Sequence, residues 1–136
     1  MACPRLGRRA IAATELALVA PILITLMLCV HDLADGFQVS IRLERAARAG
    51  AQVAMSGTTD LTAVQSAVIS AWPALSASDV PLPVLSCECG TTSVSCTATC
   101  ASGLIRTVTV RATRQLSPLL LRSYAQGVGH AVARLN

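Results

Sequence analysis

Residues 10–30 read AIAATELALVAPILITLMLCV, and this stretch decides how the rest of the chain is organised. As a helix, 21 residues extend for about 31 Å, which is enough to cross the hydrocarbon core of a bilayer. Glu15 is the only charged residue within the stretch, and an ionisable side chain in an apolar membrane segment is by default a candidate functional residue. Arg5, Arg8 and Arg9 precede it, so the positive-inside rule predicts a cytoplasmic N-terminus and an external remainder.

A cleaved secretory signal is the first alternative for this stretch. Its charge-free part, Leu16 to Val30, has 15 residues, a length that also suits the apolar core of a signal peptide. A signal peptidase needs small residues just after the apolar run, but His31 and Asp32 stand there. A lipoprotein signal at Cys29 is disfavoured because the residue before it is the bulky Leu28. The sequence therefore favours a retained membrane segment.

Helical character continues beyond the membrane segment. Residues 31–56 contain no Pro, and Leu33, Phe37 and Ile41 repeat every four residues, which marks one apolar stripe. The polar side of the same segment carries Arg42, Glu44, Arg45 and Arg48. We therefore predict one long helix from about residue 10 to about residue 55, buried in lipid at one end and in protein at the other.

A second, shorter helix is predicted after the break at SGTTD. Gly57 can end the long helix, and Asp60 can cap the segment DLTAVQSAVISA. Trp72 and Pro73 end this second helix. The Pro-rich stretch PALSASDVPLPV then links the helical half to residues whose side-chain pattern repeats every two positions, as in a β-strand.

The C-terminal half predicts a small antiparallel sheet of about three to four strands. The clearest strand is 104–114, in which Val108, Val110 and Ala112 share one face with Arg106. Three shorter strands are predicted at 84–89, 93–100 and 128–135. Residues 116–124 are either a bulged edge strand or an apolar loop, because Pro118 argues against a central strand. The fold class is therefore α+β.

Four cysteines cluster in this half, and in an exported domain they predict a disulfide framework. They are Cys87, Cys89, Cys96 and Cys100. Cys87 and Cys89 lie two apart on one strand, too far for a bond between them, so bridges from each to Cys96 or Cys100 are favoured. Four thiolates could instead hold Zn²⁺, but the spacing lacks the C-x2-C of common zinc knuckles, and we expect no metal site. Cys3 and Cys29 are expected to stay free thiols.

Composition and charge argue against two other classes of protein. The net charge of +4 comes from eleven scattered Arg residues, and aromatic residues make up 2% of the chain, so no basic and aromatic patch suggests nucleic-acid binding. His31 and His130 stand without a nucleophile or carboxylate pattern, and no Gly-rich phosphate loop is present. We expect no enzyme activity and no cofactor.

The quoted motifs carry a family resemblance over essentially the whole chain. RRAIAATELALVAPILITLM resembles the N-terminus of the TadE-like pseudopilins of the tight-adherence (Flp) type IV pilus system. RLERAARAGAQVA looks like the segment that continues the helix in that family, and the cysteine cluster and the closing AVARLN are also similar to it. The resemblance implies a pilin-like fold, with a long N-terminal membrane helix that continues into the external domain.

The resemblance also implies a processing event. In this family a prepilin peptidase cuts so that the Glu becomes the fifth residue of the mature chain, which here places the cut between Ala10 and Ile11, four residues before Glu15. The sequence departs from the family pattern in two places, with Ala10 where Gly is usual and Leu16 where an aromatic residue is frequent. The implied organisation is a basic cytoplasmic leader at 1–10, a transmembrane segment at 11–30 and an extracytoplasmic domain at 31–136.

Physical chemistry suggests what Glu15 would do after such a cut. The new amine of Ile11 is a positive charge in or near the membrane, and Glu15 of a neighbouring subunit could neutralise it. Alternatively, Glu15 merely complements the positive end of the helix dipole near the headgroups. Pro21 can bend the helix, although Pro is tolerated in membrane helices.

The expected function is that of a minor pilin or pseudopilin. Its partners would be the membrane, other pilins or pseudopilins, the prepilin peptidase and the pilus assembly platform, and it would lie in the bacterial inner membrane or be associated with the pilus. The alternative is an uncleaved single-pass membrane protein with an extracytoplasmic adhesion or sensing domain.

Overall fold

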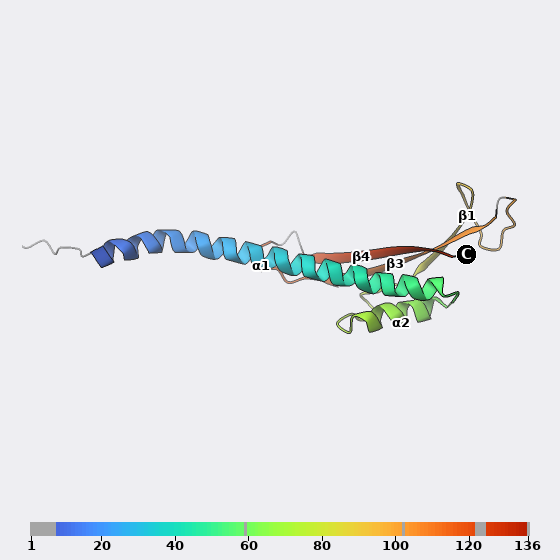
Figure 1. The fold of residues 1–136 in the computed structure, drawn as a ribbon, viewed down its shortest axis with the longest axis horizontal. Helices are drawn as coiled ribbons and strands as arrows, with labels where there is room; N and C mark the ends of the chain where they lie inside the picture. Colours follow the sequence, from blue (N-terminus) through green and yellow to red (C-terminus); the bar gives the residue numbers. More distant parts are fainter. Residues whose placement is uncertain (1–7, 59, 102, 122–124, 136) are drawn as a thin grey trace, which may run out of the picture.

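The computed structural model describes residues 8–58, 60–101, 103–121 and 125–135. Two helices are followed by four strands, and the molecule is a long rod with a head packed along one end (Figure 1). The elements are α1 (Arg8–Met55), α2 (Leu61–Ala71), β1 (Val84–Cys89), β2 (Thr92–Val94), β3 (Ile105–Gln115) and β4 (Gln126–Leu135). The predicted α+β class is confirmed. Residues 1–7 of the predicted leader, with Arg5 and Cys3, lie outside the described residues.

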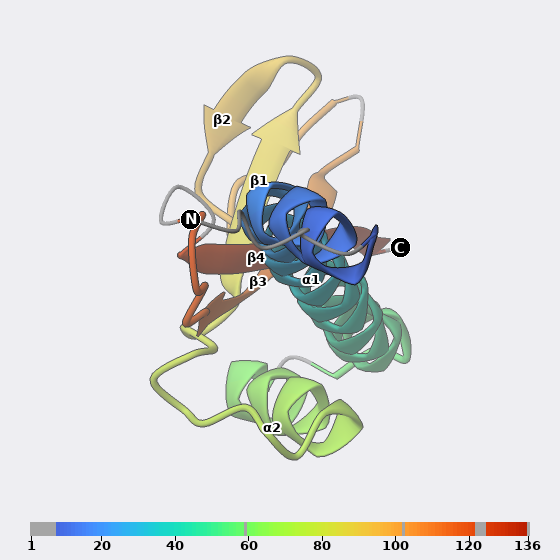
Figure 2. The ribbon, with the colours of Figure 1, turned by 90° about the vertical axis from the view of Figure 1, so that its left-hand side faces the viewer.

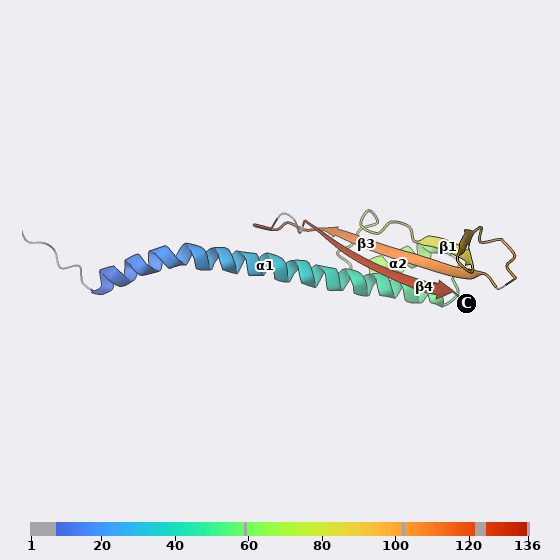
Figure 3. The ribbon, with the colours of Figure 1, turned by 90° about the horizontal axis from the view of Figure 1, so that it is seen from above.

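The long helix α1 has 48 residues and extends for about 72 Å. Its predicted limits are confirmed to within two residues. The first half of α1 projects free of the head, and the second half runs under the sheet (Figures 1 and 3). Figure 3 shows the helix bending in its blue, N-terminal part, the part that contains Pro21. Proline removes one backbone hydrogen bond and crowds the preceding turn, which accounts for a bend there.

The second helix, α2, begins as the sequence predicts. Asp60 is its N-cap, and the carboxylate of Asp60 accepts hydrogen bonds from the backbone N–H of Thr62 at 2.9 Å and from the hydroxyl of Thr62 at 2.6 Å. Val64 and Val68 are buried against α1. Gly50 of α1 allows this close crossing, because a Cβ there would collide with the side chain of Val68.

The four strands form one antiparallel sheet in the order β2-β1-β3-β4. The central pair is long, with Arg106 opposite Leu135 at one end and Gln115 opposite Gln126 at the other. Seen along α1, α2 and the β1–β2 hairpin lie on opposite sides of that helix (Figure 2). One face of the sheet therefore covers the second half of α1.

Small residues dominate the core between the helices and the sheet. Its buried members are Leu43, Ala46, Ala47, Ala51, Ala54, Val64, Val68, Leu75, Val80, Val108, Val110, Ala112 and Ala133. Strand β4 comes closest to α1 at Gly129, where an added Cβ would lie 2.6 Å from the backbone nitrogen of Glu44 and 2.7 Å from the Cβ of Leu43. The absence of a side chain at Gly129 thus sets how closely the sheet approaches the helix.

Two sequence predictions need correction. The strand predicted at 93–100 is much shorter, because β2 ends at Val94 and Cys96 and Cys100 are bonded to β1 by disulfides instead of pairing in a ladder. The apolar stripe of Leu33, Phe37 and Ile41 is not part of the buried core, and all three side chains are exposed, although Leu33 and Phe37 line a hollow with Leu116 and Gln126 of the head. The buried face of α1 carries Leu43 and four Ala residues instead. Ala side chains are small, so a search for regularly spaced large apolar residues does not find this face.

Candidate processing site and its membrane-proximal surroundings

The predicted processing residues all lie in the first turns of α1. Ala10, Ile11 and Glu15 are helical, and the side chains of Ile11 and Glu15 are exposed. The hydroxyl of Thr14 donates a hydrogen bond of 2.7 Å to the carbonyl oxygen of Ile11. Because residues four apart lie one above the other on a helix, Ile11 and Glu15 share a face. The bond expected to be cut and the carboxylate are thus about one turn apart.

The apolar part of α1 offers its side chains to the surroundings on every side. From Ile11 to His31 all residues are exposed except Ala20, Leu28 and Cys29, which are half-buried. By length and composition, this is a helix that can cross a membrane. The hydroxyl of Thr25 donates to the carbonyl oxygen of Pro21 at 2.8 Å, which satisfies its polar group within the helix.

Asp32 joins α1 to a distant part of the chain. Its carboxylate accepts three backbone hydrogen bonds, from the N–H of Leu119 at 2.9 Å, of Leu120 at 2.7 Å and of Leu121 at 3.0 Å. The Asp32 side chain is buried, with 6% of the residue exposed. The three N–H donors, that of Leu119 first, stabilise the charged form and lower the pKa of Asp32 below its ordinary value.

Sequence reasoning missed this contact. The residues that bond Asp32 lie 87 to 89 positions away, in the connection between β3 and β4. Residues 116–121 of this connection contain no strand, so for these residues the prediction of a loop is correct and that of an edge strand is wrong. Residues 122–124 lie outside the described residues. The signal for the contact was an acidic residue placed two positions after the end of an apolar run.

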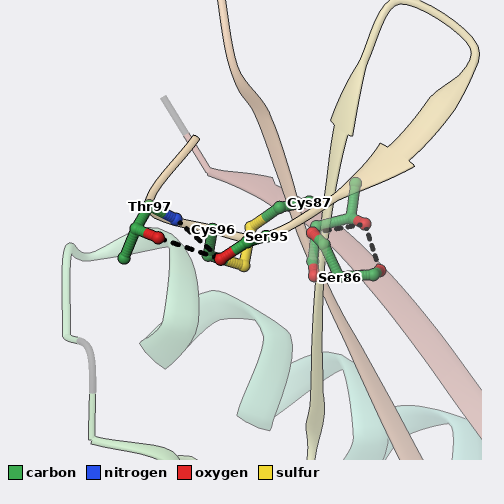
Figure 4. Close-up of a disulfide and its surroundings, with 6 residues drawn as sticks. Ser86, Cys87, Ser95, Cys96 and Thr97 are labelled. Atoms are coloured by element: carbon green, nitrogen blue, oxygen red, sulfur yellow. Dashed lines mark hydrogen bonds between the residues drawn. A yellow bond between two sulfur atoms is a disulfide. The ribbon is translucent and has the colours of Figure 1, made fainter. Parts of the chain in front are cut away.

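Two disulfides hold the far end of the head. Cys87 bonds to Cys96 and Cys89 bonds to Cys100, one of the pairings that the sequence favoured. Figure 4 shows the first of them, with the hydroxyls of Ser95 and Thr97 beside it, 2.9 Å apart. Cys87 is fully buried, and Cys29 in α1 is a half-buried free thiol. The disulfides therefore replace strand pairing as the support of residues 95–101.

A hollow in the head lies between the end of α1, the start of α2 and the sheet. It has a volume of about 340 Å³, and Arg106 is the charged residue in a lining that is otherwise mostly apolar. The two histidines lie apart, His31 beside Asp32 on α1 and His130 opposite Arg111 in the sheet. Among the described residues, no group of three or more His, Cys, Asp or Glu side chains could hold a metal ion.

Comparisons with known proteins agree with the N-terminal motifs. No curated protein and no solved structure gives a significant match to the chain. A family model does match, and its residues coincide with α1 from the residue before the expected cut almost to the end of the helix. The matched family suggests a protein related to the tight-adherence pilus. Residues 10–52 match the model described as TadE-like protein, the family that the sequence resembles.

Proposed function

We propose that this chain is a membrane-anchored minor pilin or pseudopilin, which a prepilin peptidase cuts between Ala10 and Ile11 and which helps to assemble a tight-adherence type IV pilus. Its leader faces the cytoplasm of the bacterial cell, residues 11–30 cross the inner membrane, and the head lies outside. Its role is structural, through contacts with other pilins and the assembly platform, and involves no enzyme activity.

The observation that carries this proposal is the division of α1 into an exposed apolar half and a buried half. A helix with apolar side chains exposed on all sides is stable only where something apolar surrounds it, either lipid or neighbouring helices. The second half is held to the head by Leu43 and a row of Ala residues. The head is therefore fixed to a helix that can pass from lipid into a bundle of similar helices.

The exposed stripe of Leu33, Phe37 and Ile41 supports contacts between subunits. These side chains extend the apolar surface of α1 beyond the predicted membrane segment, and they remain 38%, 61% and 50% exposed in the order given. A filament core built from packed helices would bury them. Full burial of such a side chain contributes roughly 1.5–3 kcal/mol. Because these three are 38–61% exposed, burial of the remainder would contribute about half of that for each.

Glu15 supplies the polar part of that contact. After the cut, the amine of Ile11 and the carboxylate of Glu15 on a neighbouring helix can neutralise each other in a region where a lone charge costs about 2.5–3.5 kcal/mol. Loss of this pairing, at about 2–3 kcal/mol, corresponds to a roughly 30- to 150-fold weaker association. A subunit displaced along the filament axis would separate the charges, so the pairing also favours one register.

N-terminal mass analysis of the membrane-extracted protein, from cells with and without the peptidase, tests the cut. We expect a mature chain beginning at Ile11 only where the peptidase is present. Ala10→Gly should increase the cut fraction, and Ala10→Leu should abolish it because the peptidase requires a small residue there. Ala13→Leu is the matched control and should be cut normally. A chain that starts at Met1 or Ala2 in the presence of peptidase contradicts the proposal.

The role of Glu15 is tested by Glu15→Gln, which keeps the size of the side chain and removes its charge. We expect normal cutting but much weaker co-purification with partner pilins. Thr14→Val, at the neighbouring exposed position, is the control. Equal co-purification of Glu15→Gln and the unchanged protein would leave Glu15 the simpler role of complementing the helix dipole.

One observation favours a second function, that of an uncleaved single-pass protein with an external adhesion or sensing domain. Ala10 stands where the family usually has Gly, and an uncut leader would keep α1 as a permanent anchor. In that case the chain would retain its N-terminus under all conditions and remain in the membrane fraction when pili are sheared from cells. A cut after residue 30 would contradict both functions.

A further inference from the structure

The connection between β3 and β4 returns to the end of the predicted membrane segment. After Gln115 the chain leaves the sheet, and the backbone N–H groups of Leu119, Leu120 and Leu121 bind the carboxylate of Asp32. Figure 3 shows this orange-red connection reaching along α1 toward its N-terminal half, further than any strand of the head. Residues 118–121, here called the leucine loop, are therefore the part of the described head nearest to the membrane segment.

The depth of the leucine loop follows from the helix. Residues 11–30 of α1 extend for about 30 Å, the thickness of the hydrocarbon core. Asp32 lies two residues further, about 3 Å beyond that core and within the headgroup region. Because three consecutive amides bind its carboxylate directly, the backbone of the leucine loop is held at the same depth. Leucine side chains attached there can reach the acyl chains.

Burial along α1 agrees with this position. Leu28 and Cys29 precede Asp32 by one turn and share its face of the helix, and both are half-buried although most residues around them are exposed. Leu119 and Leu120 themselves remain 63% and 45% exposed. Two large apolar side chains thus stand open where the apolar part of α1 ends, and Leu119 shares a hollow there with His31, Asp32 and Asp35. Water is an unfavourable environment for both.

We propose that the leucine loop is a membrane-contacting loop: Leu119 and Leu120 enter the outer boundary of the lipid bilayer, and Asp32 positions them there. The partner is the lipid itself, because the loop lies at the depth where the apolar surface of α1 ends, and the three hydrogen bonds fix it at that depth. The head would then touch the membrane at two places, α1 and the leucine loop, which restricts its tilt relative to the bilayer. This inference rests on the proposed membrane insertion of α1.

Tryptophan fluorescence of the full chain in lipid vesicles tests the contact. In a Trp72→Phe background, which removes the single native Trp, the variants Leu119→Trp and Leu120→Trp each carry one reporter. Vesicles made with lipids brominated near the headgroup end of their acyl chains quench a Trp that lies among those chains. We expect loss of most of the fluorescence at both positions and a shift of the emission to shorter wavelength.

Two matched variants make the result interpretable. Leu18→Trp lies about 18 Å from Val30, deep in the apolar part of α1, and is measured with lipid brominated near the ends of the acyl chains. It must be quenched if the helix is inserted, so its failure would count against the proposed membrane anchor and not against the loop. Met55→Trp replaces an apolar residue that is 57% exposed at the distant end of α1, and it should not be quenched. Quenching at position 18 without quenching at 119 and 120 would overturn the inference.

A second copy of this chain is the other possible occupant of the leucine loop. In that case the emission of the two loop reporters would depend on the ratio of protein to lipid and would not respond to brominated lipid, which also overturns the inference.

The positioning role of Asp32 is tested by Asp32→Ala in the same reporters. We expect weaker quenching and faster hydrogen exchange at the amides of Leu119 to Leu121, with the circular dichroism spectrum unchanged. Unchanged quenching and exchange would show that Asp32 does not hold the loop.

Discussion

The two halves of α1 are one continuous helix, yet they depend on different environments. The first half carries large apolar side chains, such as Leu18, Ile22 and Met27, and exposes them on all sides. The second half buries mainly Ala and Gly against the sheet and keeps its Arg residues on the open side. Large side chains suit a fluid surrounding that adapts to any shape, whereas small ones allow a sheet to approach closely. Side-chain size therefore distinguishes the exposed apolar half from the half that packs against the head.

An arginine placed in each half gives the largest expected difference. Ala47 is fully buried, so Ala47→Arg should destabilise the head by more than about 4 kcal/mol and leave it unfolded. Ile22→Arg should leave the head folded but reduce membrane insertion, at a cost of about 2.5–3.5 kcal/mol. Fluorescence of Trp72, which packs against the core, reports folding, and carbonate extraction reports insertion. If Ala47→Arg and Ile22→Arg unfolded the head to the same extent, the two halves of α1 would not depend on different environments.

Removal of the disulfides tests how far the stability of the head depends on its distal end. The bonds close short loops with sequence separations of 9 and 11, for which chain entropy predicts a loss of about 2–3 kcal/mol each. Replacing Cys87 and Cys96 by Ser should cost more than replacing Cys89 and Cys100, because Cys87 is buried and a hydroxyl there would lack a partner. Urea unfolding followed by Trp72 fluorescence measures both. Membrane insertion should be unaffected.

Two glycines of β4 test the close approach of the sheet to the second half of α1. Gly129→Ala places a Cβ against the helix backbone, which cannot move aside, and should cost about 1–3 kcal/mol. Gly127→Ala is the matched control, because its Cβ would meet only the ends of the Leu43 and Val39 side chains, at 3.0 Å. Urea unfolding should therefore separate the two variants. Similar free energies of unfolding for the two variants would mean that α1 shifts easily under the sheet.

Acidification gives the smallest expected effect, and it acts at the junction of the two halves. The pKa of Asp32 is lower in the folded chain than its ordinary value of 3.8. The folded state therefore binds this proton more weakly than the unfolded state, so the contact stabilises the fold above about pH 4 and is lost as the pH falls through the folded pKa. Hydrogen bonds from Ser76 and Thr62 lower the pKa values of Asp79 and Asp60 in the same sense.

Hydrogen exchange of the Leu119 to Leu121 amides between pH 7 and pH 3 measures the effect at Asp32. Protection should decrease toward low pH after correction for the intrinsic exchange rate. In Asp32→Asn, protection should be lower at pH 7 and nearly independent of pH. A pH-dependent loss of the same size in both proteins would assign the effect to Asp60 and Asp79 instead.

The parts of the fold that follow from local pattern could be predicted from the sequence. The helix limits, the Asp60 cap and strand β1 rest on periodicity and capping within a few residues, and they are confirmed. The length of β2 could not be predicted, because Ser, Thr and Cys residues suit a strand while the disulfides impose another path. The Asp32 contact depends on residues almost ninety positions away. Whether Ala10, Ile11 and Glu15 act as proposed stays a prediction.

The continuity of α1 has a consequence for how far the head extends from the apolar half of the helix. The helix runs without interruption from Arg8 to Met55, so its end stands about 37 Å above Val30. The hairpin of β1 and β2, with its disulfides, lies at this outer end (Figure 1). A covalently braced tip is thus carried at a fixed height on a rigid support. If the apolar half of α1 lies in a membrane, as proposed, this cross-linked tip is the part of the head furthest from the lipid.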